Sequence, residues 1–258
     1  MKFFVLIFAV WTCQLLAGAD GVVRIADTVG DGVFRAAALQ LALAGKTVAC
    51  TQERVTPEKA FAGLQKGDYD LVLAYRSVVP ESLQAQCRDY AVDAVMISVN
   101  AGNSRSSFTS GELAEAFSGK RRSWVSFNGE DRQIHLMRLE DNSSAVKIFR
   151  KKVMGKLAFA PAFERKNTVE LLHLAVLNKN ALVLSGRPDA ELSTGLKAVT
   201  VDGVYPSLEN VKKGRYPLCE KRTVLNGKHL SREAQILLEA VFSADMGEII
   251  ADCGLIQP

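Results

Sequence analysis

Short apolar runs alternate with amphipathic segments along the first part of the chain. Four of the runs have the length and β-branched content of buried strands: residues 22–26, 46–50, 70–74 and 91–99. Between the first two runs, the apolar residues of 33–43 recur at the spacing of one helix face. Thr56 and Pro57 form an N-cap followed by proline, which predicts a second helix ending at Gly67. This alternation favours a mostly parallel sheet with helices on both faces.

The same alternation continues through the rest of the chain. Thr109 and Glu112 have the spacing of a capping box and predict a helix that stops at Gly119. Further patterns predict strands at 134–138, 181–184, 198–201 and 217–224, and helices after the cap 141–144, over 169–177 and over 231–253. The order fits two α/β domains better than one. We predict a first domain from residues 20–98 plus 200–258, and a second from residues 99–199.

The N-terminus has the pattern of a secretory signal. A lysine follows Met1, an apolar run extends over residues 3–16, and Ala17-Gly18-Ala19 provides a small-x-small cleavage site. A membrane anchor is the alternative, but the run is shorter than the roughly 20 residues that a spanning helix needs. We therefore predict a signal peptide over residues 1–19, cleavage near Ala19 and a periplasmic or secreted mature protein.

Composition narrows the class of function. Hydrophobic residues make up 48% of the chain and charged residues 23%, as in ordinary folded domains. The net charge of +4 is small and dispersed, which argues against nucleic-acid binding. The sequence contains no G-x-S-x-G elbow, no H-E-x-x-H pair and no phosphate-binding glycine loop ending in Lys-Ser/Thr. We predict a binding protein rather than an enzyme, with no cofactor.

The mature chain would keep an even number of cysteines: Cys50, Cys87, Cys219 and Cys253. Thiols tend to pair in an oxidising compartment, and four of them allow three connectivities. We predict Cys50–Cys87 and Cys219–Cys253 disulfides, with buried thiols as the alternative. No two cysteines have C-x-x-C spacing and the histidines are scattered, so we expect no metal site.

Polar turns that follow predicted strands are the best candidates for a ligand site. In open α/β sheets, ligands bind beyond the carboxyl ends of strands, where helix N-termini present free N–H groups. The three turns of this kind are residues 27–31, residues 75–77, and Arg138 with residues 141–144. A guanidinium beside hydroxyls and a helix N-terminus suits a compact oxyanion. The alternative is that Asn142 only caps its helix and Arg138 is a surface charge.

Segments around these turns resemble the phosphate-binding periplasmic proteins of the type II solute-binding fold. Residues 70–81 are similar to the family pattern D-I-A-x-A-S-R-P-L-x-x-E, and residues 91–100 to I-A-x-D-A-I-x-V-I-V-N. Residues 108–124 resemble L-T-x-x-Q-L-x-x-I-F-x-G-K-x-x-x-W, and residues 201–211 resemble D-G-V-x-P-S-x-E-N-V. The resemblance covers almost the whole mature chain. It implies a two-domain α/β fold with a ligand cleft between the domains.

The resemblance also implies a function and a set of ligand-binding residues. It implies a monomer that captures phosphate and hands it to the membrane subunits of an ABC transporter. Arg138 falls at the family's phosphate-binding arginine, and Asp93 could accept the proton of a hydrogen phosphate or serve only as a strand-end carboxylate. The ligand-binding residues predicted in this way are Thr28, Tyr75, Asp93, Arg138, Asn142, Ser143 and Ser144.

The sequence departs from the family pattern at three places near these residues. Tyr75 stands in place of a serine, Asp27-Thr28 in place of Gly-Ser, and residues 142–144 in place of Ser-Gly-Thr. Asp27 adds a negative charge where an anion is expected. The alternative function is therefore a sensor or interaction module of the same fold, with an altered or absent ligand.

Overall fold

The computed structural model describes residues 21–30, 32–186 and 195–258. The predicted signal peptide and Asp31 of the first turn lie outside these residues. The chain forms two compact units. Unit 1 contains residues up to 91 with 221–253 and 257–258, and unit 2 contains residues 92–220 with 254–256. Strands β4 (Arg88–Asn100) and β11 (Cys219–Asn226) each contribute residues to both units.

The sheet of unit 1 is built on the strand order β2-β1-β3-β11. Strand β1 (Val23–Asp27) pairs in parallel with β2 (Cys50–Arg54) and β3 (Leu71–Tyr75), and β11 runs antiparallel to β3. The apolar residues of β1 and β3 are buried, as their runs predict. Because β1 and β3 are parallel, their carboxyl ends and the two polar turns after them lie at the same edge of the sheet.

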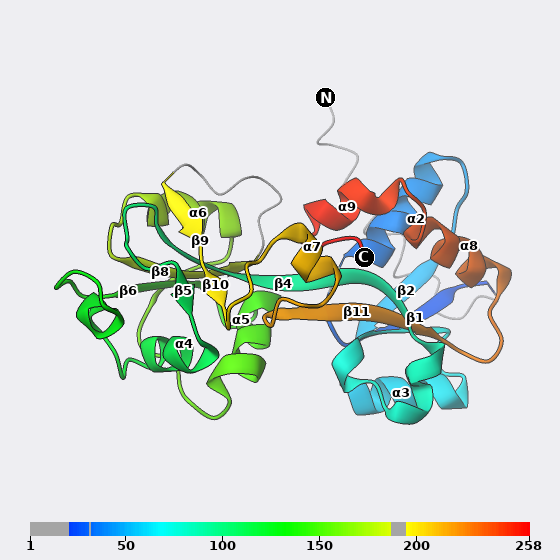
Figure 1. Cartoon of the computed structure of the whole chain (residues 1–258). Coiled ribbons are helices and arrows are strands. Elements are labelled where there is room, and N and C mark those ends of the chain that lie inside the picture. Colours follow the sequence, from blue (N-terminus) through cyan, green and yellow to red (C-terminus); the bar gives the residue numbers. More distant parts are fainter. Residues whose placement is uncertain (1–20, 31, 187–194) are drawn as a thin grey trace. The chain divides into compact units, whose positions relative to one another are not determined.

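The helices that cover this sheet in the described part of unit 1 are α2 (Val33–Leu43), α3 (Pro57–Lys66), α8 (Arg232–Val241) and α9 (Met246–Asp252). Helix α2 packs against α8 and α9, and in Figure 1 its blue ribbon lies between the red α9 and the orange-brown α8. Helix α3 begins as predicted, because the Thr56 hydroxyl accepts the Lys59 N–H at 3.4 Å and Pro57 follows. It ends at Gly67, which has a φ of +83°.

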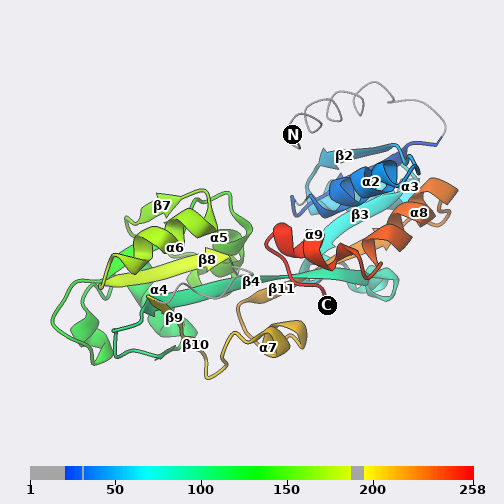
Figure 2. The same cartoon turned by 90° about the horizontal axis from the view of Figure 1, so that it is seen from above.

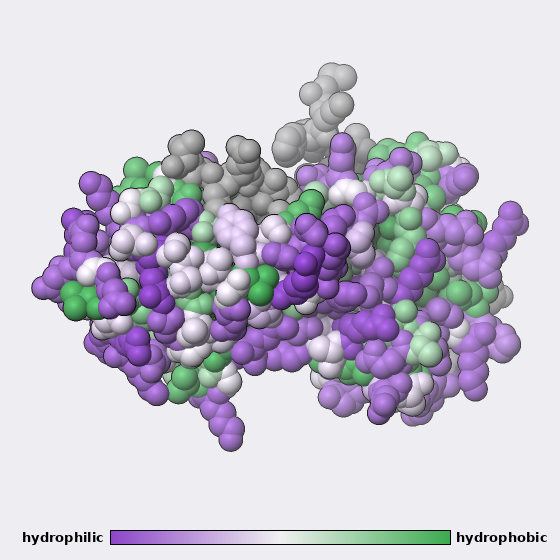
Figure 3. Space-filling model, in the orientation of Figure 1, coloured by the Kyte–Doolittle hydropathy of each residue, from purple (hydrophilic) through white to green (hydrophobic). Residues whose placement is uncertain are grey.

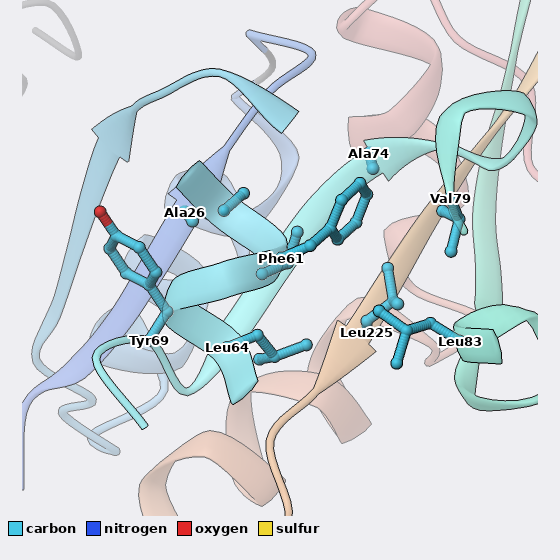
Figure 4. Close-up of a cluster of buried hydrophobic side chains, with 10 residues drawn as sticks. Ala26, Phe61, Leu64, Tyr69, Ala74, Val79, Leu83 and Leu225 are labelled. Atoms are coloured by element: carbon cyan, nitrogen blue, oxygen red, sulfur yellow. The ribbon is translucent and has the colours of Figure 1, made fainter. Parts of the chain in front are cut away.

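One apolar cluster shows how unit 1 is held together. Phe61 and Leu64 of α3 lie over Ala74 of β3 and Leu225 of β11 (Figure 4). Val79 and Leu83 come from the segment after β3, which contains the 3-10 helices η1 (Arg76–Val78) and η2 (Glu81–Gln86), and complete the cluster. Burial of these side chains fixes α3 and β3, and with them the position of the turn at Tyr75.

Unit 2 has its own sheet, with the strand order β4-β8-β6-β7 and β9 (Leu196–Ala198) also paired with β4. Strand β8 (Ala181–Gly186) runs antiparallel to β4 and parallel to β6 (His135–Leu139), which pairs in parallel with β7 (Phe163–Arg165). A smaller pair joins β5 (Ser107–Phe108) to β10 (Thr200–Val201). Helices α5 (Ser144–Phe149) and α6 (Thr168–Val176) both pack against β8 and β6, and Figure 1 shows α6 above and α5 below these strands. Figure 2 shows β8 alongside β4.

The remaining elements of unit 2 are mostly short helices. They are α4 (Ser110–Phe117), the 3-10 helix η3 (Trp124–Phe127), α5 (Ser144–Phe149), the π-helical segment η4 (Arg150–Met154), α6 (Thr168–Val176) and α7 (Leu208–Lys212). The predicted capping box of α4 is confirmed. The Thr109 hydroxyl accepts the Glu112 N–H at 3.1 Å, and the Glu112 carboxylate accepts the Thr109 N–H at 2.8 Å. Both units are α/β, as predicted.

The predicted disulfides are not formed in the structure. The thiols of Cys50 and Cys219 are buried, that of Cys87 is half-buried and that of Cys253 is exposed. The Cys219 thiol donates to the carbonyl of Tyr216 at 2.9 Å, and the Cys87 thiol donates to that of Leu83 at 3.7 Å. Cys219 also belongs to unit 2 and Cys253 to unit 1, whereas the prediction placed both in one domain.

The surface is mixed in polarity. On the face drawn in Figure 3, hydrophilic side chains predominate and hydrophobic ones form only small scattered patches. Among the described residues, no helix is long and apolar enough to cross a membrane.

Candidate functional site

Arg138 lies on β6, where the strand approaches its carboxyl end, and it is only 6% exposed. Its Nη1 donates to the carbonyl of Leu139 at 3.1 Å and to the Asp141 carboxylate at 2.7 Å. Its Nη2 donates to the Glu164 carboxylate at 2.5 Å, because β6 and β7 pair with Arg138 opposite Glu164. The alternative in which Arg138 is a surface charge is wrong. Its buried guanidinium is held by two carboxylates.

A second arginine shares these contacts. Arg150, the first residue of η4, donates from Nη2 to the same oxygen of Asp141 at 3.2 Å. The guanidinium carbons of Arg138 and Arg150 each lie 4.7 Å from the centre of the Phe159 ring. Two guanidiniums and the two carboxylates of Asp141 and Glu164 therefore form one cluster, whose formal charges cancel.

The turn after β6 leads directly into α5. The Ser143 hydroxyl accepts the N–H of Val146 at 3.2 Å and so caps the helix. Ser143, and not Asn142, is therefore the N-cap residue. Asn142 is exposed in the turn, and Ser144 is the first helical residue and half-buried. The structure thus brings Arg138 and residues 142–144 together on one strand–turn–helix segment.

Asp93 lies in the same unit, on β4. It is only 2% exposed and belongs to a run of buried residues that extends from Tyr90 to Val99. A ligand-binding role for Asp93 stays a prediction.

The first turn belongs to unit 1, and its donors are already used within the chain. The Asp27 carboxylate is buried and accepts the N–H groups of Val29 at 2.8 Å and Gly30 at 2.6 Å. Its other oxygen accepts from Gln52 at 2.9 Å and lies 3.8 Å from Arg54. The backbone N–H and the hydroxyl of Thr28 both donate to the carbonyl of Leu73, at 3.0 and 2.9 Å. An oxyanion would have to compete for these donors.

Tyr75 ends β3, beside a buried cation that the sequence analysis missed. Arg222 of β11 stands opposite Tyr75 in the antiparallel pair, and its guanidinium carbon lies 5.6 Å from the centre of the Tyr75 ring. Arg222 is only 3% exposed. The signal in the sequence was that Arg222 lies within the predicted strand 217–224, where an arginine is unusual.

Neither a metal cluster nor a cavity adds to this site in the described part of the chain. Among residues 21–30, 32–186 and 195–258, no cluster of His, Cys, Asp and Glu side chains could hold a metal ion. A cavity of about 220 Å³ in unit 2 is lined by residues that include Trp124, Lys179 and Asn180, and none of the predicted site residues lines it.

Comparison with known proteins places this geometry in a family. A family model described as the PBP superfamily domain matches residues 18–243, and no curated protein shows a significant match. An ABC-type phosphate transport receptor from Vibrio cholerae has a similar structure, with a TM-score of 0.74 and 21% identity over 92% of this chain and 100% of that one. PstS from Borrelia burgdorferi also has a TM-score of 0.74, with 16% identity over 92% of this chain and 99% of that one. These likenesses confirm the predicted fold.

Proposed function

The chain belongs to the PBP superfamily domain family, and from that premise we propose that it is an exported solute-binding protein that captures a small oxyanion. Phosphate is the first candidate, because the similar structures include a phosphate transport receptor. Delivery to the membrane subunits of an ABC transporter is part of this proposal, and catalysis is not. The observation that carries it is a buried arginine, Arg138, at a strand end beside the N-terminus of α5.

The turn between β6 and α5 offers the two things that an oxyanion requires when it leaves water. It needs compensating positive charge and it needs hydrogen-bond donors. Arg138 supplies the charge, and its Nε–H is buried without an acceptor in the described part of the chain. The first N–H groups of α5 have no i−4 carbonyl to bond, and the Ser143 hydroxyl takes only that of Val146. The proposal places the oxyanion against the N–H groups of Ser144 and Ala145.

The carboxylates that now pair with Arg138 do not prevent this role. The side chains of Asp141 and Glu164 are 65% and 40% exposed, whereas that of Arg138 is 7% exposed. A carboxylate that is already largely hydrated returns to water at low cost, and the oxygens of the ligand then accept the hydrogen bonds that it leaves on the guanidinium. An oxyanion can therefore exchange with one of them. Thr28, Tyr75 and Asp93 stay predicted contacts of the same ligand.

A second candidate function is a sensor or interaction module with an altered or absent ligand. Asp27 favours it, because its buried carboxylate occupies the N–H groups of the first turn that an anion would otherwise use. Titration with phosphate distinguishes the two candidates.

The test is calorimetric titration of the mature protein with phosphate and sulfate at fixed salt. A charge-assisted hydrogen bond contributes about 1.5 to 3 kcal/mol, so Arg138→Ala should weaken phosphate binding by about tenfold to more than a hundredfold. Ser144→Ala should weaken it less, because the helix N-terminus stays. Arg132→Ala is the matched control, since Arg132 is an exposed arginine of unit 2 that pairs with Glu130.

Each outcome decides between the candidates, provided that circular dichroism shows every variant to be folded. Equal affinity of wild type and Arg138→Ala would remove Arg138 from the site. No phosphate or sulfate binding by wild type at millimolar ligand would reject oxyanion capture and favour the interaction module.

A further inference from the structure

The cluster at the carboxyl end of β6 contains a second cation that the proposed function does not use. Arg150 and Arg138 both donate to one oxygen of Asp141, at 3.2 and 2.7 Å. Both guanidiniums also lie 4.7 Å from the centre of the same ring, that of Phe159. One carboxylate oxygen thus accepts from two guanidiniums placed on one aromatic side chain.

Two guanidiniums that donate to one oxygen have the arrangement expected of an anion-binding site. Guanidiniums donate to carboxylates and phosphates with the same planar geometry. Two guanidiniums that bind a carboxylate oxygen can therefore also bind an oxygen of another oxyanion. The ring of Phe159 supports both cations by a cation–π contact and keeps them together. In this structure the carboxylate bound by the two guanidiniums is that of Asp141, a residue of the protein itself.

The exposures of the three side chains show which of them can move. Arg138 is buried, the Asp141 side chain is 65% exposed and that of Arg150 is 44% exposed. Asp141 lies in the turn between β6 and α5, outside both elements. Arg150 is fixed at the start of a π-helical segment, a feature that often accompanies functional sites. The carboxylate is therefore the exchangeable member of the cluster.

We propose that Arg150 is the second ligand-binding cation of this site, and that the Asp141 carboxylate is a built-in competitor that the ligand displaces. The proposal rests on the proposed oxyanion-binding function and deepens it. Two guanidiniums favour an oxyanion that carries two negative charges, such as the phosphate dianion or the dianionic head of a phosphate monoester. Asp141 lowers the affinity for such ligands, because each binding event must first release its carboxylate from both arginines.

The experiment measures inorganic phosphate binding by calorimetry in wild type, Asp141→Asn, Arg150→Gln and the double variant. Asp141→Asn keeps the shape of the side chain and removes its charge, so phosphate should bind about three- to tenfold more tightly. Arg150→Gln should weaken binding by about tenfold or more. In the double variant the gain from Asp141→Asn should be lost. Asp131→Asn is the matched control, as it removes an exposed carboxylate of unit 2 outside this cluster.

Tighter binding is a result that a merely structural role of Asp141 would not produce. A phosphate monoester titrated in parallel shows whether the site takes the free ion or a substituted one. If wild type binds phosphate and Arg138→Ala does not, but Asp141→Asn and Arg150→Gln match wild type, this inference is overturned and the proposed function stands. If neither wild type nor folded Asp141→Asn binds phosphate at millimolar concentration, both are overturned.

Discussion

The turns after β1 and β6 each place an aspartate against donors of the chain, but the two carboxylates have different surroundings. Asp27 of the first turn is buried and accepts two backbone N–H groups and the amide of Gln52. Asp141, in the turn after β6, is exposed and accepts hydrogen bonds from the side chains of Arg138 and Arg150. The backbone donors of the first turn are therefore bonded within the chain, whereas at the start of α5 the side-chain acceptor seen among the described residues is the Ser143 hydroxyl, which takes the N–H of Val146.

The difference shows that an acidic residue near an anion site can either stabilise the fold or occupy the place of a ligand. A buried carboxylate that holds backbone N–H groups is part of the fold, because its removal leaves those groups without acceptors. An exposed carboxylate that holds arginine side chains can be replaced by a ligand with similar oxygens. Sequence position alone does not distinguish the two. Burial and the identity of the donors do.

The largest expected effect comes from removing the two carboxylates in turn. Asp27→Ala should lower the free energy of unfolding by about 2 to 5 kcal/mol, because it leaves the buried N–H of Val29 unpaired and removes charge-assisted hydrogen bonds. Asp141→Ala should lower it by less than Asp27→Ala does, because the Asp141 side chain is 65% exposed and Glu164 still pairs with Arg138. Urea unfolding followed by circular dichroism measures both.

Asp27→Asn is the control for the first substitution, since its side-chain oxygen can still accept the N–H groups of Val29 and Gly30. It should lose less stability than Asp27→Ala. Equal losses for Asp27→Ala and Asp141→Ala would contradict the comparison between the two turns.

A smaller effect is expected at the cap of α5. Ser143→Ala removes the acceptor of the Val146 N–H and should lower the free energy of unfolding by about 1 kcal/mol. Ser143→Asp should restore most of this stability, because aspartate is also a good N-cap. If Ser143→Ala leaves the urea midpoint unchanged, the hydroxyl does not hold the start of this helix.

The sequence predicted the elements whose signals are local. The caps at Thr56 and Thr109 need only neighbouring residues, and both form as expected. The second strand was placed too early, at 46–50, whereas β2 covers Cys50–Arg54. Thr51, Gln52 and Glu53 are polar, but β2 is an edge strand and needs no continuous apolar run.

The last predicted helix shows a second limit of local patterns. Apolar spacing continues over 231–253, yet the structure divides this segment into α8 and α9. The Ser243 hydroxyl donates to the carbonyl of Ala240 at 2.8 Å, and such side-chain bonds compete with helix continuation. No glycine or proline stands between α8 and α9, so this break has no strong signal in the sequence.

At the site, the strand–turn–helix segment was predictable and its electrostatics were not. Arg138 and residues 142–144 are close in sequence, and their grouping followed from the position of a turn after a strand. Glu164 is 26 residues from Arg138 and meets it only through the pairing of β6 with β7. Arg222 reaches Tyr75 through the pairing of β11 with β3. Contacts that depend on strand register cannot be deduced from spacing along the chain.

The smallest expected effect concerns Gly30 in the first turn. Gly30 has a φ of +75°, and a Cβ added there would lie 1.8 Å from Nη1 of Arg54, the residue that also lies beside Asp27. Gly30→Ala therefore combines the backbone strain of a left-handed residue, about 1 to 2 kcal/mol, with displacement of a guanidinium. Gly45→Ala is the matched control. Its φ is +77° and its added Cβ would meet no atom within 4 Å.

Because the backbone strain is shared, the difference between these two glycine variants isolates the contact with Arg54. The Arg54 side chain is 50% exposed and can move away, so Gly30→Ala should be less stable than Gly45→Ala by under about 1 kcal/mol. Thermal unfolding of the two variants, repeated on an Arg54→Ala background, measures it. On that background the difference should vanish. If it persists unchanged, Arg54 does not pack over Gly30, and the carboxylate of Asp27 is held by its hydrogen bonds alone.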